Sequence, residues 1–291
     1  MADLLFDDSL TADRARRFGG VARLYGDQAL SRFERSHVAI VGLGGVGSWA
    51  AEALARSAIG ALTLIDLDHV AESNTNRQLH ALDGNYGKSK AQAMAERIVL
   101  IDPACRVTVV EDFLEAHNVE QLLGGGFDFV IDAIDAARHK TALIAWCVAH
   151  RQPVITVGAA GGQTDPTRVT REDLALTVQD PLLAKVRNQL RREHHFARGK
   201  KARFRVPAVY SSEPVRYPIT SSSDDAAFDA ALAAPAEPSN LSVPTPLDTG
   251  AVPSASGPAG LSCAGFGSSV CVTAVFGFAA AAHVLNTLAA V

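Results

Sequence analysis

The stretch VAIVGLGGVGSWAAEALARSAIGALTLIDLD, residues 38–68, constrains the fold of this 291-residue chain more than any other feature. An apolar run ends in Gly42-x-Gly44-x-x-Gly47, a segment of helical composition follows, and the next apolar run ends at Asp66. A strand, a glycine turn and a helix in this order are typical of nucleotide-binding βαβ units, where the helix N-terminus approaches a phosphate. The pattern leaves open whether the nucleotide is NAD or ATP, and the glycines could also serve only a tight turn.

Short runs rich in Val, Ile and Leu alternate with helix-like stretches through the first half of the chain. We predict strands near 37–42, 61–66, 106–110, 127–132 and 153–157, and helices near 46–58, 88–100, 117–123 and 137–150. Apolar strands separated by helices are typical of a parallel sheet covered on both faces, with ligands at the carboxyl ends of the strands. The predicted fold class is therefore α/β, a doubly wound, Rossmann-like, mostly parallel sheet with a C-terminal extension and a buried terminal helix.

The C-terminal run SVCVTAVFGFAAAAHVLNTLAAV is apolar and long enough to cross a membrane. No Lys or Arg follows Arg216, so the positive flank that orients a span is missing. Small residues together with His283 and Asn286 favour a helix buried in the fold or in a dimer, and we expect no stable membrane anchoring. The N-terminal residues 1–17 carry acids where a secretion signal needs basic residues, so we expect a cytoplasmic protein.

Charge and cysteine content narrow the choice of partner. The four cysteines form no Cys-x-x-Cys pair, which argues against structural zinc. Residues 185–205 hold nine of the 27 Lys and Arg residues and a single acid, Glu193, whereas the rest of the chain has 18 basic and 30 acidic residues. A basic face on an acidic protein suits a polyanion such as RNA, while a solvated helix and loop is the plainer interpretation.

Polar residues beyond the second predicted strand favour ATP over NAD. They are Asp66 and Asp68, then Asn74 and Arg77 in SNTNRQ, then Lys90 in GKSK, and finally Asp135 in DAID after the fourth predicted strand. A triphosphate carries several negative charges that Arg, Lys and a metal ion neutralise, whereas a dehydrogenase has no need of this set. Taken singly, Asp66 could cap a segment and Lys90 could be a surface charge. Together the residues predict a site for ATP and Mg²⁺.

Through GLGGVGS, LIDLD, SNTNRQ, GKSK and DAID, in this order, the chain resembles the ThiF/MoeB/HesA family of adenylating enzymes, related to ubiquitin-activating enzymes. The resemblance covers about residues 15–215 and the final helix. It implies that ATP is held by the glycine loop (Gly42, Gly44, Gly45, Gly47), its ribose by Asp66 and Asp68, its phosphates by Asn74, Arg77 and Lys90, and Mg²⁺ by Asp135. It also implies catalytic roles for Arg77, Lys90, Asp135 and Arg17, the last reaching the ATP of the partner subunit in a homodimer.

The stretches RRFGGVARLYG, QDPLLAKVR and CAGFGSSVCVTAVFGF resemble the branch of this family that acts on threonylcarbamoyladenosine beside the anticodon of tRNA. The implied reaction is ATP-dependent cyclisation, a dehydration through a carboxyl-adenylate. A nucleophile within the substrate makes a catalytic cysteine unnecessary. Cys263, in CAGFG, could serve a cysteine desulfurase or another sulfur-acceptor system, although packing is the favoured role.

Other activities remain open. An adenylating enzyme that activates a ubiquitin-like sulfur-carrier protein is the main alternative, although such enzymes commonly carry the Cys-x-x-Cys pairs that this chain lacks. An NAD-dependent oxidoreductase and a nucleotide-binding scaffold without catalysis are the others.

We divide the chain into five segments on these grounds. They are an N-terminal helical arm (1–36) for dimer contact and ATP binding in trans, a Rossmann-like ATP-binding core (37–160), a part facing substrate and tRNA (161–219), a mobile low-complexity loop (220–260), and a C-terminal helix packed on the core (261–291). The loop is rich in Ser, Pro, Ala and Asp, a composition that cannot bury enough apolar surface to offset chain entropy.

Overall fold

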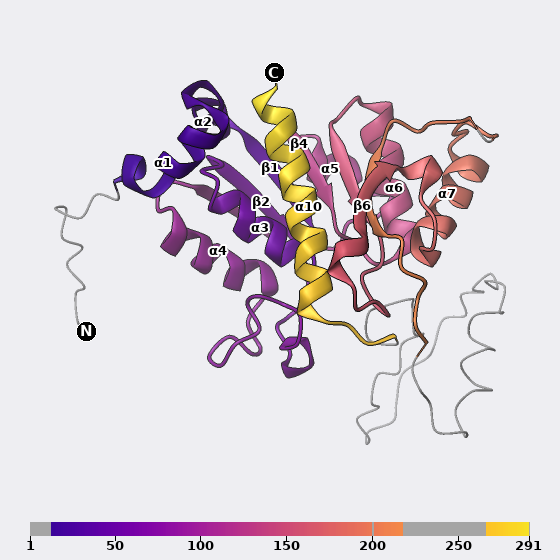
Figure 1. Cartoon of the computed structure of the whole chain (residues 1–291), viewed down its shortest axis with the longest axis horizontal. Helices are drawn as coiled ribbons and strands as arrows, with labels where there is room; N and C mark the ends of the chain where they lie inside the picture. The colour runs from indigo at the N-terminus through magenta and orange to yellow at the C-terminus, as the bar shows by residue number, and fades with distance from the viewer. Residues whose placement is uncertain (1–12, 200, 218–265, 291) are drawn as a thin grey trace, which may run out of the picture.

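A computed structural model describes residues 13–199, 201–217 and 266–290 of the chain (Figure 1). The loop predicted at 220–260 and Cys263 lie outside the described residues.

The described part of the chain is built on one seven-stranded sheet. Its strands are β1 (His37–Val41), β2 (Ala61–Ile65), β3 (Arg106–Val110), β4 (Phe129–Asp132), β5 (Val154–Val157), β6 (Val169–Asp173) and β7 (Pro207–Ser211). The order is β3-β2-β1-β4-β5-β7-β6, and every pair is parallel except β6 with β7. After β3 the chain returns to the middle of the sheet, so the carboxyl ends of β1 and β4 flank the switch point where such sheets bind ligands.

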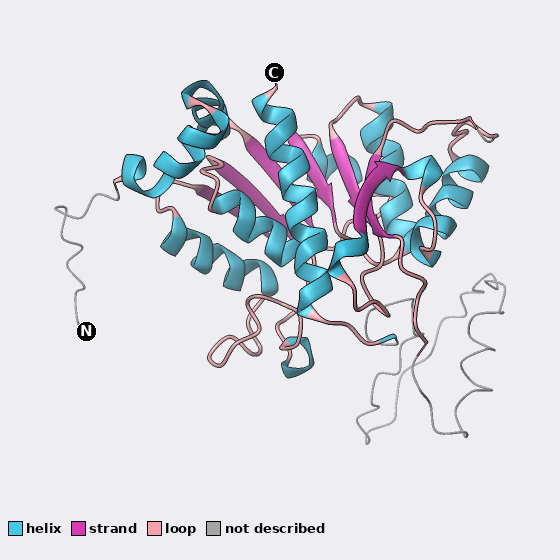
Figure 2. Cartoon of the chain, in the orientation of Figure 1, coloured by secondary structure: helices cyan, strands magenta, loops and turns pink. Residues whose placement is uncertain are grey.

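Helices cover both faces of this sheet (Figure 2). They are α1 (Arg14–Tyr25), α2 (Asp27–Arg35), α3 (Gly47–Ala55), α4 (Lys90–Ile101), α5 (Val119–Leu123), α6 (Ala137–Ala149), α7 (Pro181–Glu193) and α10 (Val270–Ala289), with short 3₁₀ turns η2 (Glu72–Asn74), η3 (Pro166–Arg168) and η4 (Leu174–Leu176). One apolar cluster joins the sheet to α2, α3, α4 and α10, and another joins it to α5, α6 and α7. The predicted α/β fold class is confirmed.

Strands β6 and β7 are the elements that the sequence pattern does not predict. The middle three residues of β6 are exposed, because this strand lies at the edge of the sheet, so it has no apolar run to mark it. Both strands come from residues 161–219, which therefore extend the core sheet.

The predicted C-terminal helix is α10, and it packs along α3 in the front layer of Figure 1. Gly277 makes this contact close, since a Cβ atom there would lie 2.5 Å from the Val46 carbonyl oxygen. Among the described helices, α10 is the one whose length and composition would allow it to cross a membrane. Half of its most apolar 18-residue stretch is buried inside the fold.

Candidate active site

A cavity of about 590 Å³ opens at the carboxyl ends of the central strands. Nine of the ten residues predicted to bind nucleotide line it: Gly42, Gly44, Gly45, Asp66, Asp68, Asn74, Arg77, Lys90 and Asp135. The tenth, Gly47, lies directly behind the loop as the first residue of α3. The sheet therefore brings together side chains that are spread over about a third of the chain.

The glycine loop has two kinds of glycine. Gly42 has φ +89°, and a Cβ on Gly47 would lie 1.8 Å from the Gly42 carbonyl oxygen, so both residues are required by the tight turn itself. Gly44 has room, because the nearest atom to a Cβ there would be the Gln78 Nε2, 3.9 Å away. The absence of a side chain at Gly44 therefore opens the wall of the cavity beside the start of α3, where a helix N-terminus favours an anion.

The two acids of LIDLD have different environments. Asp66 is buried, and its oxygens accept hydrogen bonds from the backbone N–H groups of Leu43 (2.6 Å) and Asp68 (2.8 Å). Burial raises the pKa of Asp66, although Lys90 and these hydrogen bonds oppose the rise. The Asp68 carboxylate is more than half exposed and pairs with the Lys90 Nζ at 2.7 Å. Asp66 thus holds the glycine loop to β2, while Asp68 and Lys90 present opposite charges to the cavity.

The segment SNTNRQ forms the rim of the cavity. The Asn74 side-chain oxygen accepts from the Ala71 N–H at 3.1 Å, which closes the 3₁₀ turn η2. The Arg77 Nη1 donates to the Ser73 carbonyl (2.8 Å) and to the Asn76 side chain (2.9 Å). In the described structure the Arg77 guanidinium has no carboxylate partner, so its charge is available to an anion in the cavity.

Asp135 and Arg17 lie in very different places. Asp135 follows β4, is exposed, and lines the cavity. Arg17 is on α1, outside this cavity, and its Nη1 donates to the Ile101 carbonyl at 2.5 Å within the same chain. The structure brings Asp135 to the other predicted residues but does not bring Arg17 there.

Several cavity residues were not predicted as site residues. They are Val41, Val46, Ile65, Gln78, residues 112–115, residues 133–134, Ala136, His139, residues 158–160, Leu182 and Thr273. Gln78 belongs to the SNTNRQ motif, so the sequence carried a signal for it. Val41, Val46 and Ile65 lie in β1, the glycine loop and β2, beside residues that the sequence predicted. The rest follow β3, β4 and β5 or belong to α6, α7 and α10, and they meet only because of the strand order.

The donor set agrees with a magnesium ion shared with phosphates. Within the described residues, no group of three or more His, Cys, Asp or Glu side chains could hold a metal ion. Magnesium differs from zinc in this respect, because proteins usually bind it with one or two carboxylates while water and substrate phosphates complete its coordination. The exposed carboxylate of Asp135 at the cavity suits that mode.

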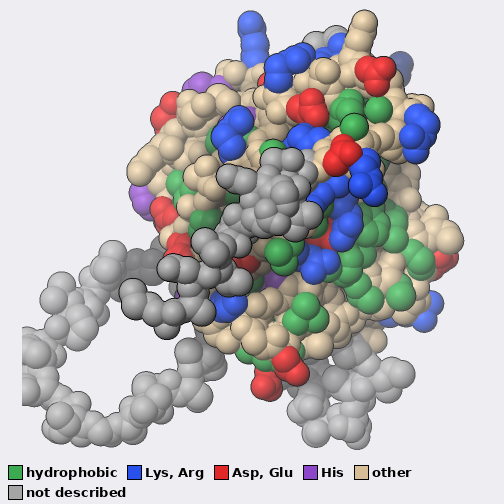
Figure 3. Space-filling view, turned by 90° about the vertical axis from the view of Figure 1, so that its left-hand side faces the viewer, with side chains coloured by type: hydrophobic (Ala, Val, Ile, Leu, Met, Phe, Trp, Pro, Cys, Tyr) green, Lys and Arg blue, Asp and Glu red, His purple; other side chains and the backbone are tan. Residues whose placement is uncertain are grey.

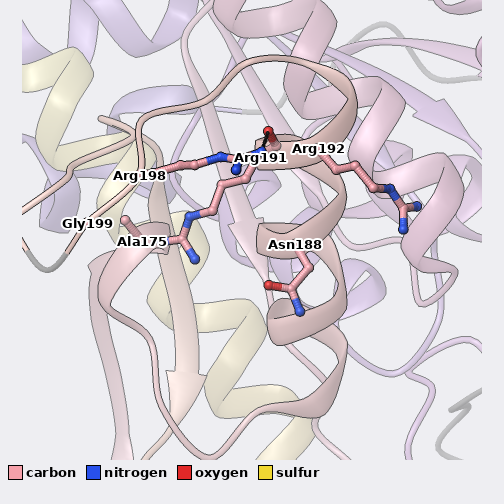
Figure 4. Close-up of a pocket in the computed structure, with 6 residues that line it drawn as sticks. All are labelled: Ala175, Asn188, Arg191, Arg192, Arg198 and Gly199. Atoms are coloured by element: carbon pink, nitrogen blue, oxygen red, sulfur yellow. Dashed lines mark hydrogen bonds between the residues drawn. The ribbon is translucent and has the colours of Figure 1, made fainter.

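A second concave site lies beside the last turns of α7, within the basic segment 185–205. It is lined by Ala175, Asn188, Arg191, Arg192, Arg198 and Gly199 (Figure 4). The Arg191 guanidinium stacks on the Phe204 ring at 5.2 Å, and the Arg198 Nη2 donates to the Arg191 carbonyl at 3.3 Å. Figure 4 shows the Arg192 side chain pointing away from these two. Arg191 and Arg198 form no ion pair with any described carboxylate.

The sheet and its switch-point cavity define a nucleotide-binding α/β protein whose basic residues suit a phosphate-rich ligand. The chain belongs to the ThiF family, whose sequence model matches residues 19–291. It is 48% identical to the tRNA threonylcarbamoyladenosine dehydratase of Escherichia coli, over 94% of each chain, and 42% identical to that of Haemophilus influenzae, over 94% of this chain and 93% of the other. The crystal structure of the E. coli enzyme in complex with ATP superposes with a TM-score of 0.78 at 43% identity, covering 99% of this chain and 98% of that one.

Proposed function

We propose that this chain is an ATP-dependent tRNA threonylcarbamoyladenosine dehydratase, which cyclises the modified adenosine beside the anticodon. The observation that carries the proposal is similarity over almost the whole length to enzymes of that name, one of them crystallised with ATP. The placement of the predicted residues around one cavity agrees with it.

In the proposed reaction the carboxylate of the threonyl group attacks the α-phosphorus of ATP, and pyrophosphate leaves. The carbamoyl group of the same substrate then attacks the activated carbonyl carbon, loses a proton and closes a ring as AMP leaves. The net change in the nucleoside is the loss of one water. Because both reacting groups belong to one bound nucleoside, the protein's task is to orient them and to stabilise charge at phosphorus.

The placement of the cavity residues supports the following roles. The open wall at Gly44 admits phosphates to the start of α3, and Arg77 and Lys90 stabilise the charge that develops as pyrophosphate leaves. Asp66 holds the glycine loop through hydrogen bonds, and Asp68, which is more than half exposed and pairs with Lys90 through its Oδ2, is the acid proposed to accept from the ribose hydroxyls. Asp135 would hold Mg²⁺, which when bound neutralises phosphate charge.

The basic concave site beside α7 is the proposed contact for the tRNA backbone. Leu182 at the start of α7 lines the active cavity, while Arg191 lies in the last turn of the helix. At 1.5 Å per residue these positions are about 14 Å apart along the axis, so one tRNA could occupy both sites. The double variant Arg191→Glu with Arg198→Glu should weaken tRNA binding and flatten its salt dependence. The matched control is Arg35→Glu with Arg106→Glu, which changes two exposed arginines elsewhere; equal loss in the two double variants would refute this contact.

A homodimer is part of the proposal. Figure 3 shows the face that carries α1 and α4, where hydrophobic side chains gather beside Lys and Arg. Leu24 on α1 and Leu100 on α4 are 76% and 82% exposed, and a partner subunit that packs on this face would bury them. In a dimer, Arg17 would exchange its bond to Ile101 for the ATP of the partner. If analytical ultracentrifugation finds a monomer at micromolar concentration, both the homodimer and the contact of Arg17 with the partner's ATP are refuted.

Localisation, the division into segments and the role of Cys263 complete the proposal. A tRNA-modifying enzyme is expected in the cytoplasm. The division of the chain at 36, 160, 219 and 260 stays a prediction, and residues 161–219 also add β6 and β7 to the core sheet. A link of Cys263 to a cysteine desulfurase stays a prediction.

The decisive experiment measures pyrophosphate release from ATP with tRNA that carries threonylcarbamoyladenosine and with the same tRNA unmodified. Release that requires the modified tRNA, together with a nucleoside lighter by one water in mass spectrometry, is the expected result. Release with a small protein ending in Gly-Gly, and none with the modified tRNA, would refute the dehydratase and favour sulfur-carrier activation.

A further inference from the structure

Lys140 lies fully buried beneath the loops that line the active cavity. It is in the first turns of α6, and its side chain is 0% exposed. Its Nζ donates to the Asp132 Oδ2 (2.8 Å), the Asp132 carbonyl (3.3 Å) and the Thr156 Oγ1 (3.2 Å). A buried ammonium is costly unless it is paired and hydrogen-bonded, and here acceptors from β4 and β5 supply all three bonds.

The carboxylate of Asp132 links Lys140 to the loop that carries Asp135. Its Oδ2 accepts from Lys140 and from the Thr156 hydroxyl (2.6 Å), and its Oδ1 accepts from the Ile134 N–H (3.2 Å). The last bond turns the chain at the end of β4, one residue before Asp135. The ammonium, the carboxylate and the backbone of the turn thus form one continuous set of hydrogen bonds.

The turn is also pressed against the glycine loop. A Cβ atom on Gly42 would lie 2.8 Å from the Ala133 carbonyl oxygen and 3.3 Å from the Ile134 nitrogen. A shift of the turn would therefore move two walls of the cavity, the one that holds Asp135 and the one that includes Gly42.

A second buried carboxylate, Asp180, stands near the same lysine. It accepts from the Ala159 N–H (2.9 Å) in the loop after β5 and from the Leu183 N–H (2.8 Å) in α7. Burial raises the pKa of both Asp132 and Asp180, and the charge of Lys140 opposes that rise for each. One lysine therefore stabilises two carboxylates, each of which holds a loop that lines the cavity.

We propose that Lys140 is a positioning residue for adenylation, which acts through Asp132 to fix the turn that presents Asp135 to the nucleotide. The inference rests on the proposed function only in taking ATP as the ligand. Without the ammonium, Asp132 is a buried carboxylate with one partner fewer, and it can no longer hold the turn in one place. A misplacement of about 1 Å at a reacting centre can lower a rate by about a hundredfold.

The test is a double-mutant cycle between Lys140→Met and Asp135→Ala, with ATP affinity from calorimetry and the steady-state rate as readouts. Alone, Lys140→Met should lower kcat/KM for ATP by about tenfold to a hundredfold. In the Asp135→Ala background the same change should cost less than about twofold, because the group that it positions is gone. If the fold losses in kcat/KM of the two single variants multiply to give that of the double variant, the two residues act independently and the proposal is overturned.

A matched control separates positioning from general stability. Ile144 lies one turn further along α6 and is 0% exposed, so Ile144→Val disturbs packing in the same helix without touching the hydrogen bonds. Its effect on kcat/KM should be small and independent of Asp135→Ala. Coupling as strong as that of Lys140→Met would overturn a specific role for the lysine.

Thr156 offers a milder change if Lys140→Met does not fold. Thr156→Val removes the hydroxyl that donates to Asp132, while Thr156→Ser keeps it. The valine variant should lose ATP affinity and rate, and the serine variant should recover most of both. Equal losses in the two variants would overturn the proposal.

The binding readout keeps this inference separate from the proposed function. A chain that binds ATP but leaves modified tRNA unchanged would refute the dehydratase, whereas coupling of Lys140 and Asp135 in ATP affinity would still stand. If Asp135→Ala alone leaves ATP affinity and rate unchanged, the turn presents nothing to the nucleotide and the inference is refuted.

Discussion

Replacing Gly44 by alanine separates the two roles that a glycine loop can have. The Gly44 φ is not in the left-handed region, and a Cβ there would meet only the flexible end of Gln78 at 3.9 Å. Gly44→Ala should therefore fold normally and even gain about 0.4–1 kcal/mol, because alanine restricts the unfolded chain. A purely structural glycine would show the opposite result.

The affinity for ATP should fall in the same variant. The new methyl group would stand on the wall of the cavity, where it blocks a phosphate from approaching the backbone N–H groups at the start of α3. Loss of one hydrogen bond to a charged group costs about 1.5–3 kcal/mol, which corresponds to about a tenfold to hundredfold weaker Kd. Gly44→Ala is thus expected to be as stable as the wild type or more stable, and to bind ATP poorly.

Urea unfolding, calorimetric titration with ATP and the variant Gly47→Ala complete the experiment. The Gly47 Cβ would overlap the Gly42 carbonyl oxygen at 1.8 Å, so this variant should lose about 1–3 kcal/mol or more of the free energy of unfolding. Wild-type ATP affinity in Gly44→Ala would refute the argument, because the missing side chain at Gly44 would then not be what admits a phosphate. If Gly44→Ala loses more than about 1 kcal/mol of the free energy of unfolding, the claim that a side chain fits at this position is refuted.

Three further predictions concern single side chains. Arg77→Ala should weaken ATP binding about tenfold to a hundredfold, and Arg77→Lys should restore only part, since lysine lacks the planar fork; calorimetry that finds wild-type affinity in Arg77→Ala would contradict this. Burial lowers the pKa of His80 to about 4, so its contribution to stability is complete above the unfolded value of 6.5 and is lost as the pH falls toward 4. Between pH 7 and pH 5 the free energy of unfolding should therefore fall by about 2 kcal/mol. The variant His80→Phe loses no hydrogen bond, because neither ring nitrogen of His80 has a partner, and it should flatten the pH dependence of urea unfolding. An unchanged pH dependence would contradict this role of His80. Gly277→Ala should lower the free energy of unfolding by about 1–3 kcal/mol, because its Cβ would lie 2.5 Å from the Val46 carbonyl and force α10 away from α3; an unchanged melting temperature would contradict this packing.

The sequence predicts strands β1–β5 well and strands β6 and β7 poorly. The five predicted strands correspond to β1–β5. Strands β1, β2, β4 and β5 are almost wholly buried and need continuous apolar runs, and the edge strand β3 is marked by its three valines. Strand β6 has three exposed polar residues, and β7 begins with Pro207, which weakens a strand signal in the sequence, so neither leaves a clear strand pattern. Their pairing depends on neighbours that are far away in the chain.

The residues of the candidate site also fall into those that the sequence predicts and those that it does not. The glycine loop, Asp66, Asn74 and Arg77 can be recognised because each belongs to a short motif whose spacing has a local geometric cause. Thr273 and Lys140 carry no such signal. Thr273 reaches the cavity from a helix about 200 residues away, and Lys140 resembles any helical lysine until the fold buries it.

The sequence by itself determined the strands β1–β5 with the helices between them, the glycine turn and the charges available for a phosphate, because steric limits, burial and motif spacing act over short stretches of chain. Only the tertiary structure decided which loops meet at the cavity, that Gly44 is open while Gly47 is closed by the Gly42 carbonyl, and that Lys140 is buried against Asp132. The physical reason is that strand order and helix packing bring distant residues within hydrogen-bonding range, and a group's burial, and with it the cost of its charge, exists only after they have met.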